Sequence, residues 1–164
     1  MNKKNTIISL ILKFWTIFIG IGALIGAIMM WVDPSGKMWG LDWGLALLQQ
    51  KMPFPDILFR NFIPSGFVLL TVNGITQYVA AYLLFKNSRL APYFTLACGI
   101  ILMSWIALEW YVWGFAFLSN IYFCFGLLEA ATSIFAMKTM AAMKVNEENV
   151  AIKGKAIKGK LRSH

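Results

Sequence analysis

Four long apolar runs dominate the pattern of hydrophobic and polar positions along the chain. A helix needs about 20 apolar residues to cross the hydrocarbon core of a membrane, and each run reaches that length. The runs are Ile7–Trp31, Phe62–Phe85, Ala91–Val112 and Phe115–Met137. The pattern predicts an all-α fold, a polytopic membrane protein built as a four-transmembrane-helix bundle. The first run outlasts the apolar region of a cleaved signal peptide, so we expect it to remain as an anchor.

The segment between the first two spans has the features of an outer amphipathic element. Asp33-Pro34-Ser35-Gly36 suits a β-turn with proline at its second position, so the chain is expected to leave the membrane there. Leu41, Leu45 and Leu48 then fall on one helical face, as in a helix that lies at a membrane interface. Pro53 and Pro55 end this pattern, and Asp56 is placed to cap a short helical turn over 57–62.

Tryptophans gather toward the same outer end, and two interpretations stay open for them. An aromatic belt at the membrane surface explains them without any ligand. The alternative is an aromatic-lined outer pocket for an amphipathic molecule, whose polar end would be bound by Asp33, Asp42, Asp56 or Arg60. The tryptophans are Trp31, Trp39, Trp43, Trp110 and Trp113.

The fourth run carries a glutamate, Glu129, near its middle. A charged side chain at that depth costs about 3 kcal/mol on insertion scales, so it must face protein. Gly126, Glu129, Ala130 and Ser133 form one small, polar stripe at helical spacing. Counted inward from the outer ends of their spans, Gln77 and Glu129 lie at nearly the same depth.

These positions predict a hydrogen-bonded cluster of Asn73, Gln77, Glu129 and Ser133, in which burial favours a neutral carboxylic acid on Glu129. The cluster is either a satisfied structural core or a proton or cation site of a small transporter. Glu109 is expected near the outer boundary, on the same side of the third span as Thr95, where it can reach water or Arg60.

Gly22 and Gly26 form a G-x-x-x-G element in the first span, which allows another backbone to approach closely. It indicates either a homodimer face or tight packing inside the same bundle. Cys98 and Cys124 lie in different spans without a Cys-x-x-Cys spacing, so we expect packing residues and no metal or cofactor site.

Composition and charge complete the picture. The chain is 59% hydrophobic and 13% charged with a net charge of +8, and its mean hydropathy is +0.67. Basic residues gather before the first span, between the second and third, and after the fourth, whereas the 31–62 segment balances its charges. By the positive-inside rule we expect a multi-pass protein of the bacterial inner membrane with both termini in the cytoplasm.

The chain divides into a membrane domain over 1–144 and a basic tail over 145–164, where Ala-Ile-Lys-Gly-Lys occurs twice. Its glycines argue against a stable free helix, so we expect a disordered arm that contacts anionic membrane lipids. An acidic partner protein or RNA is less favoured, and no folded nucleic-acid motif is visible. The lipid-contacting residues would be Lys153, Lys155, Lys158, Lys160 and Arg162.

Four elements carry a family resemblance. They are Asp33-Pro34-Ser35-Gly36, Pro53-Phe54-Pro55-Asp56, Ile63-Pro64-Ser65-Gly66 and the stretch Trp105–Trp110. Over about Phe14–Met137 the chain resembles a group of bacterial four-span membrane proteins of uncharacterised activity, and in layout it is similar to DoxX-like proteins. The resemblance implies a fold and a membrane location, and it implies no catalytic residues.

The function expected from these features is that of a small inner-membrane protein without enzymatic chemistry, an accessory or interaction subunit of a membrane process with a membrane protein partner. The alternative is a proton-coupled transporter or lipophile-binding protein that uses Glu129 with Asn73 and Gln77. No Ser/His/Asp set, metal cluster or phosphate loop supports an enzyme.

Overall fold

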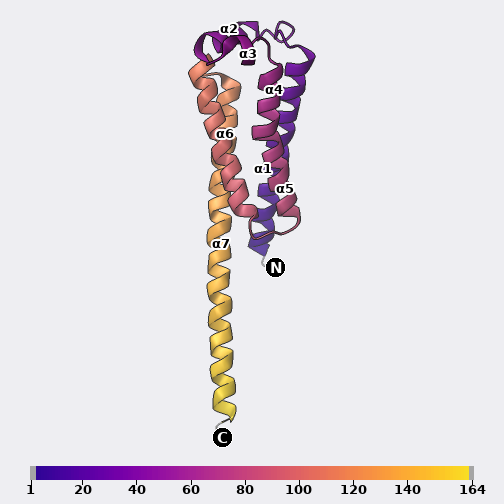
Figure 1. The fold of residues 1–164 in the computed structure, drawn as a ribbon. Helices are drawn as coiled ribbons and strands as arrows, with labels where there is room; N and C mark the ends of the chain where they lie inside the picture. Colours follow the sequence, from indigo (N-terminus) through magenta and orange to yellow (C-terminus); the bar gives the residue numbers. More distant parts are fainter. Residues whose placement is uncertain (1–2, 163–164) are drawn as a thin grey trace.

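The computed structural model describes residues 3–162, and within that range the ordered elements are all helical (Figure 1). They are α1 (Lys3–Val32), α2 (Asp42–Lys51), α3 (Pro55–Leu58), α4 (Ile63–Leu69), the π-helix η1 (Leu70–Ile75), α5 (Thr76–Phe85), α6 (Ala91–Trp113) and α7 (Phe117–Arg162). Helices α4, η1 and α5 follow one another without a break and make one span.

Four helical segments in the described part are long and apolar enough to cross a membrane. They are Thr6–Val32, Ile63–Phe85, Ala91–Trp113 and Phe117–Val150, so the predicted four-helix membrane bundle is confirmed. The first three agree with the predicted spans to within one residue at each end, because the bilayer sets the apolar length that a spanning helix needs. The fourth begins two residues later than predicted and continues 13 residues past the predicted end at Met137.

The spans run alternately up and down, and the described ends of the chain lie at the same end of the bundle (Figure 1). Helix α1 packs against the α4–η1–α5 span, and α6 packs most extensively against α7. Glycines allow the close α6–α7 contact. A Cβ on Gly99 would stand 2.8 Å from the backbone oxygen of Gly126 and 3.0 Å from the backbone nitrogen of Ala130.

The polar stripe of the fourth span faces inward, as its spacing predicts. Glu129 and Ser133 are fully buried, and Gly126 and Ala130 are buried beside them. The large apolar side chains on the opposite side of α7 are exposed, among them Leu127, Leu128 and Phe135. In a membrane these exposed side chains face lipid.

The end of the bundle opposite the chain termini, here called the outer end, is covered by α2 and α3, which lie across the ends of the spans (Figure 1). Leu48 of α2 is buried with Phe62 and Val112, and Leu45 packs against them. Leu41, predicted on the same helical face, instead precedes α2 and is exposed. Lys51 fastens α2 to α6, because its Nζ donates to the carbonyl oxygens of Tyr111 at 2.9 Å and Val112 at 3.0 Å. Trp113 Nε1 donates to the Gly44 carbonyl oxygen at 3.0 Å.

The sequence analysis assigned a turn and a helix cap to this outer segment, at Asp33 and Asp56. The Asp33 carboxylate closes the predicted turn by accepting hydrogen bonds from the Ser35 hydroxyl at 2.7 Å and the Met38 amide at 2.6 Å. The cap predicted at Asp56 is wrong. Helix α3 begins at Pro55 with Phe54 at its N-cap position and no side-chain cap, which places Asp56 inside the first turn.

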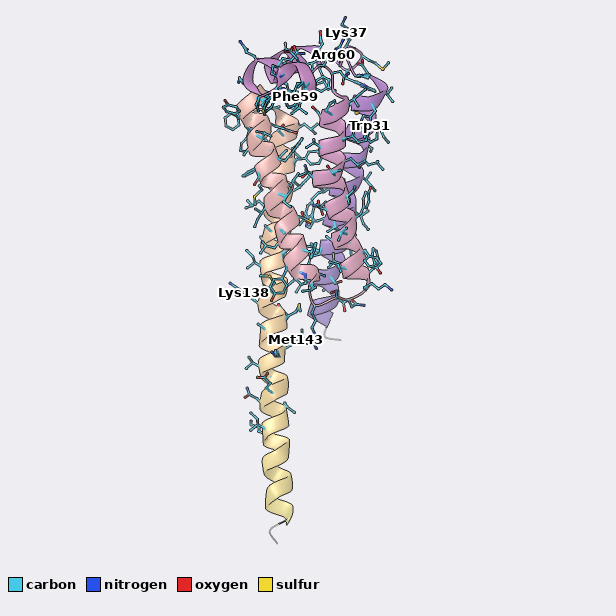
Figure 2. The ribbon with its side chains drawn as sticks, viewed as in Figure 1. Trp31, Lys37, Phe59, Arg60, Lys138 and Met143 are labelled. Atoms are coloured by element: carbon cyan, nitrogen blue, oxygen red, sulfur yellow. The ribbon has the colours of Figure 1, made fainter. Side chains whose placement is uncertain are left out.

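The structure differs from the sequence expectation at the basic tail. Helix α7 continues past the bundle to Arg162, and Figure 2 shows it projecting beyond Lys138 and Met143. A glycine inside a helix costs about 1 kcal/mol relative to alanine, so Gly154 and Gly159 weaken a continuing helix without removing its hydrogen bonds. Lys153 is exposed on this projection. The side chains of Lys155, Lys158, Lys160 and Arg162 lie outside the described part.

Candidate functional site

The interior of the bundle holds two groups of polar side chains at different depths. The deeper group surrounds Glu129 of α7 and Gln77 of α5. The outer group surrounds Glu109 of α6 and Asn73 of η1, and it lines a cavity. The sequence predicted the first group as one cluster that included Asn73, and the structure divides it.

The deep group centres on one side-chain hydrogen bond. Gln77 Nε2 donates to Glu129 Oε2 at 2.8 Å. The two residues therefore meet, as their equal depth in the sequence predicted. Gln77 is 1% exposed and Glu129 is 0% exposed, which removes both from lipid and water. Gln77 Oε1 and Glu129 Oε1 have no hydrogen-bond partner in the described structure. The pair is thus joined by one bond while two buried oxygens stay unsatisfied.

Ser133 bonds to the backbone of this site, and the described structure gives it no hydrogen bond with the Glu129 carboxyl group. Its Oγ lies 2.7 Å from the carbonyl oxygen of Glu129, one turn earlier in α7, and 2.8 Å from Thr95 Oγ1 of α6. Thr95 is also fully buried. Ser133 and Thr95 therefore tie α7 to α6 next to the Gln77–Glu129 pair, which ties α7 to α5.

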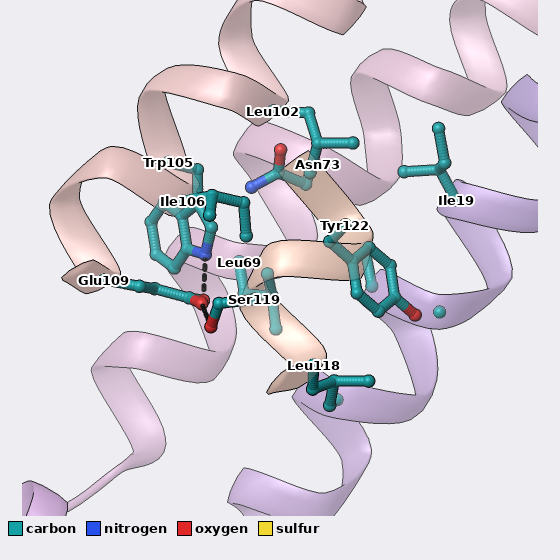
Figure 3. Close-up of a pocket in the computed structure, with 13 residues that line it drawn as sticks. Ile19, Leu69, Asn73, Leu102, Trp105, Ile106, Glu109, Leu118, Ser119 and Tyr122 are labelled. Carbon is teal, nitrogen blue, oxygen red and sulfur yellow. Dashed lines mark hydrogen bonds between the residues drawn. The ribbon is translucent and has the colours of Figure 1, made fainter. Parts of the chain in front are cut away.

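The outer group lines a partly open cavity of about 160 Å³ to which all four spans contribute residues. Figure 3 shows its lining. Glu109 lies at one side, where each carboxyl oxygen accepts one hydrogen bond. Trp105 Nε1 donates to Oε1 at 2.7 Å, and the Ser119 hydroxyl donates to Oε2 at 2.7 Å. The rest of the lining is mainly apolar and consists of Ile19, Gly22, Ala23, Gly26, Leu69, Leu102, Ile106, Leu118 and Tyr122, together with Asn73.

Asn73 belongs to this cavity and makes no hydrogen bond with Glu129. It is 2% exposed, yet its Nδ2 has no hydrogen-bond partner among the described residues. In Figure 3 its amide nitrogen points toward the side of the cavity on which Trp105 lies. Asn73 lies four residues before Gln77 and belongs to the π-helix η1, whereas Gln77 belongs to the regular helix α5 that follows.

The two glycines of the first span face the inside of the same bundle. A Cβ on Gly22 would collide with the Tyr122 hydroxyl, and one on Gly26 would stand 2.9 Å from Leu69 Cδ2. Both glycines also line the cavity. The structure thus packs Gly22 and Gly26 against Tyr122 and Leu69 of the same chain.

A second, more apolar cavity of about 170 Å³ lies beneath the outer helices and is lined by Phe59, Trp105, Leu108, Glu109 and Trp113 among others. It is the nearest counterpart to the aromatic outer pocket that the sequence left open. None of the four charged outer residues considered for that pocket lines it. Its ionisable lining residue is Glu109, which reaches both cavities and is held by Trp105 and Ser119 and not by Arg60.

The sequence analysis did not identify the hydrogen-bond donors of Glu109. Trp105 precedes Glu109 by one turn, so helical spacing offered a signal for that contact. Ser119 approaches Glu109 across the short connection between α6 and α7, and only the fold reveals this. No three His, Cys, Asp or Glu side chains in the described part of the chain gather as a metal site. Cys98 packs near the deep group, with its Sγ 3.5 Å from the Thr76 carbonyl oxygen.

Comparison of the chain with protein-family models, with curated proteins and with solved structures finds no match.

Proposed function

We propose that this protein binds a small lipophilic molecule within its transmembrane bundle and serves a membrane process as an accessory component without enzymatic chemistry of its own. The observation that carries the proposal is Asn73. Asn73 lines a cavity of about 160 Å³, and its buried amide nitrogen has no hydrogen-bond partner among the described residues. An unpaired polar group costs several kcal/mol in hydrocarbon, and a bound ligand that accepts its hydrogen bond removes that cost.

The π-helix at Asn73 adds support for a binding role. A π-helical turn breaks the regular hydrogen-bond ladder, and such turns occur frequently at functional sites. Here η1 directs Asn73 into the cavity while Gln77, in the regular helix α5, bonds to Glu129. A bundle that needed Asn73 only for packing would gain stability from an apolar side chain at this position.

Binding can be tested with ring-sized fluorinated aromatic probes by ¹⁹F NMR of the protein in lipid nanodiscs. We expect a bound signal with the protein that empty nanodiscs do not give. Ala23→Leu fills the cavity and should remove that signal, because Ala23 is 5% exposed and lines it. Ala97→Leu adds the same side chain at an exposed position of α6 and serves as the control. Equal signals from both variants would refute the proposal.

A proton-coupled transporter is the second candidate, and the Gln77–Glu129 pair favours it. A carboxyl group that is fully buried with one bound oxygen and one free oxygen is suited to hold and release a proton. Infrared difference spectroscopy of Glu129→Gln against the natural protein tests this role. A carboxylic-acid band that titrates near neutral pH and shifts with lipophilic cations supports transport, and an invariant band leaves Glu129 as a structural residue.

The proposed location is the bacterial inner membrane with both termini in the cytoplasm. The uneven distribution of basic residues supports this orientation, and both described ends lie at one end of the bundle (Figure 1). The basic part of α7 would then extend along or away from an anionic membrane surface and offer a contact for a membrane protein partner. A C-terminal reporter that is active only in the cytoplasm tests the orientation.

A further inference from the structure

We infer that an anionic phospholipid binds in a cavity at the inner end of the bundle, with an acyl chain inside the cavity and its phosphate group at Arg89. The inner end is the one at which α1 begins and α5 turns into α6 (Figure 1). This inner cavity measures about 370 Å³, and none of its lining residues lines the outer cavity around Asn73 and Glu109. The inference therefore goes beyond the lipophile binding proposed above and does not depend on it.

The walls of the inner cavity are mainly apolar and come from all four spans. Leu12 of α1, Leu84 of α5, Ala91 of α6 and Ala136 of α7 line it, and these four side chains are buried in one apolar cluster. Met140 also lines it and adds a flexible side chain that can adapt to a bound hydrocarbon. The cavity is partly open, so an acyl chain can enter it from the lipid around the spans.

The polar lining residues of the inner cavity lie mainly in the turn between α5 and α6. Asn87, Ser88 and Arg89 follow one another there, and Ser9 and Thr139 are the other polar residues of the lining. The Thr139 hydroxyl bonds to the backbone of its own helix. Arg89 is the one charged residue among the described residues that line the cavity, and none of them is acidic.

Arg89 gives the rim of the cavity a positive charge that the described residues leave unpaired. It is exposed, and its side chain has no hydrogen bond or ion pair with another described residue. A guanidinium group offers five N–H donors in a planar fork that matches phosphate oxygens. Lys86, also exposed, lies three residues earlier and adds to the positive potential of the turn. In the orientation proposed above this end faces the cytoplasm, where basic pockets between membrane helices bind anionic headgroups.

Other occupants match only part of this site. An uncharged lipophile fills the apolar walls and leaves Arg89 unpaired. A free phosphate ion pairs with Arg89 and leaves the apolar walls empty. A zwitterionic phospholipid places an ammonium group near Arg89, and no acidic lining residue is there to pair with it. An anionic phospholipid satisfies both the charge and the walls.

The decisive experiment compares phosphatidylglycerol with phosphatidylcholine that carries identical acyl chains. The natural protein is purified in detergent, each lipid is added over the same concentration range, and bound lipid is counted by native mass spectrometry. We expect phosphatidylglycerol to bind about 5-fold more tightly, which is the factor that one basic residue near an anionic headgroup supplies. Equal affinity for the two lipids would overturn the inference, and this comparison does not depend on the folding of any variant.

Matched variants locate the lipid. Arg89→Gln should reduce the ratio of phosphatidylglycerol to phosphatidylcholine affinity toward one. Lys144→Gln is its control and should leave the ratio unchanged, because Lys144 is an exposed basic residue of α7 that does not line the cavity. Ala136→Leu fills the cavity and should weaken the binding of both lipids, whereas Ala141→Leu at an exposed position of α7 should not.

Three other outcomes would each overturn the inference. An equal loss of the ratio in Arg89→Gln and Lys144→Gln would indicate a nonspecific basic surface. Displacement of phosphatidylglycerol by inorganic phosphate alone would indicate a site for a free anion. Unchanged lipid binding in Ala136→Leu would show that no acyl chain enters the cavity. None of these results bears on the outer cavity, whose lipophile is tested separately with Ala23→Leu.

Discussion

The Gln77–Glu129 hydrogen bond should contribute measurably to the stability of the bundle. We consider Gln77→Leu, Glu129→Leu and the double variant, which replace polar side chains by apolar ones of similar size. The bond measures 2.8 Å, and both residues are at most 1% exposed, so water cannot replace the lost partner. Removing only Gln77 leaves the Glu129 carboxyl without its single side-chain partner in the described structure.

The magnitude follows from the burial of the pair. Leaving a buried polar group unsatisfied costs about 1–3 kcal/mol, so each single variant should lose about 2 kcal/mol of unfolding free energy. Hydrogen bonds between membrane helices average about 0.6 kcal/mol in double-mutant cycles and reach about 1.7 kcal/mol. A fully buried bond belongs at the upper end of that range, so we expect a coupling energy of about 1–1.5 kcal/mol.

The assay is reversible unfolding in mixed micelles by titration with sodium dodecyl sulfate, followed by circular dichroism. The double variant should be less destabilised than the sum of the two single variants. Gln77→Leu combined with Glu109→Leu is the control, and these changes should add because the two residues share no hydrogen bond. A coupling energy for Gln77 and Glu129 within about 0.3 kcal/mol of zero would refute the hydrogen bond.

Three further predictions concern packing, the outer turn and the outer helix. Gly99→Val should lower the unfolding free energy of the bundle by about 1–3 kcal/mol, because a Cβ at this position meets backbone atoms of α7 that cannot move aside. In the same unfolding assay, Ala97→Val at an exposed site of α6 should be near neutral. The Ser35 hydroxyl and the Met38 amide lower the pKa of Asp33 below its ordinary 3.8. Asp33 therefore stabilises the fold above about pH 4 and loses this effect as the pH falls through its lower folded pKa, so the Tm difference from Asp33→Asn should shrink in acid. Lys51→Met removes the bonds to the last carbonyl oxygens of α6 and should lower the unfolding free energy by about 0.5–1 kcal/mol; no change would mean that the lysine is solvated instead.

The sequence by itself determined the spans of this protein and the inward face of the fourth. Bilayer thickness sets the length of an apolar helix, so the runs in the sequence predicted the first three spans to within one residue at each end, whereas the fourth helical segment continues 13 residues past its predicted end. The helical repeat places Gly126, Glu129, Ala130 and Ser133 on one side, and the cost of exposing Glu129 to lipid decides which side turns inward. Equal depth was enough to pair Gln77 with Glu129.

Only the tertiary structure decided how the remaining polar groups are divided. Asn73 lies in a π-helical turn and lines the outer cavity instead of bonding to Glu129, and no residue type in 70–75 demands such a turn. Ser119 reaches Glu109 across the short connection between α6 and α7. Hydrogen-bond partners in a bundle depend on the rotation, tilt and separation of its helices. These quantities are set by side-chain packing between spans, which the periodicity of a single span does not contain.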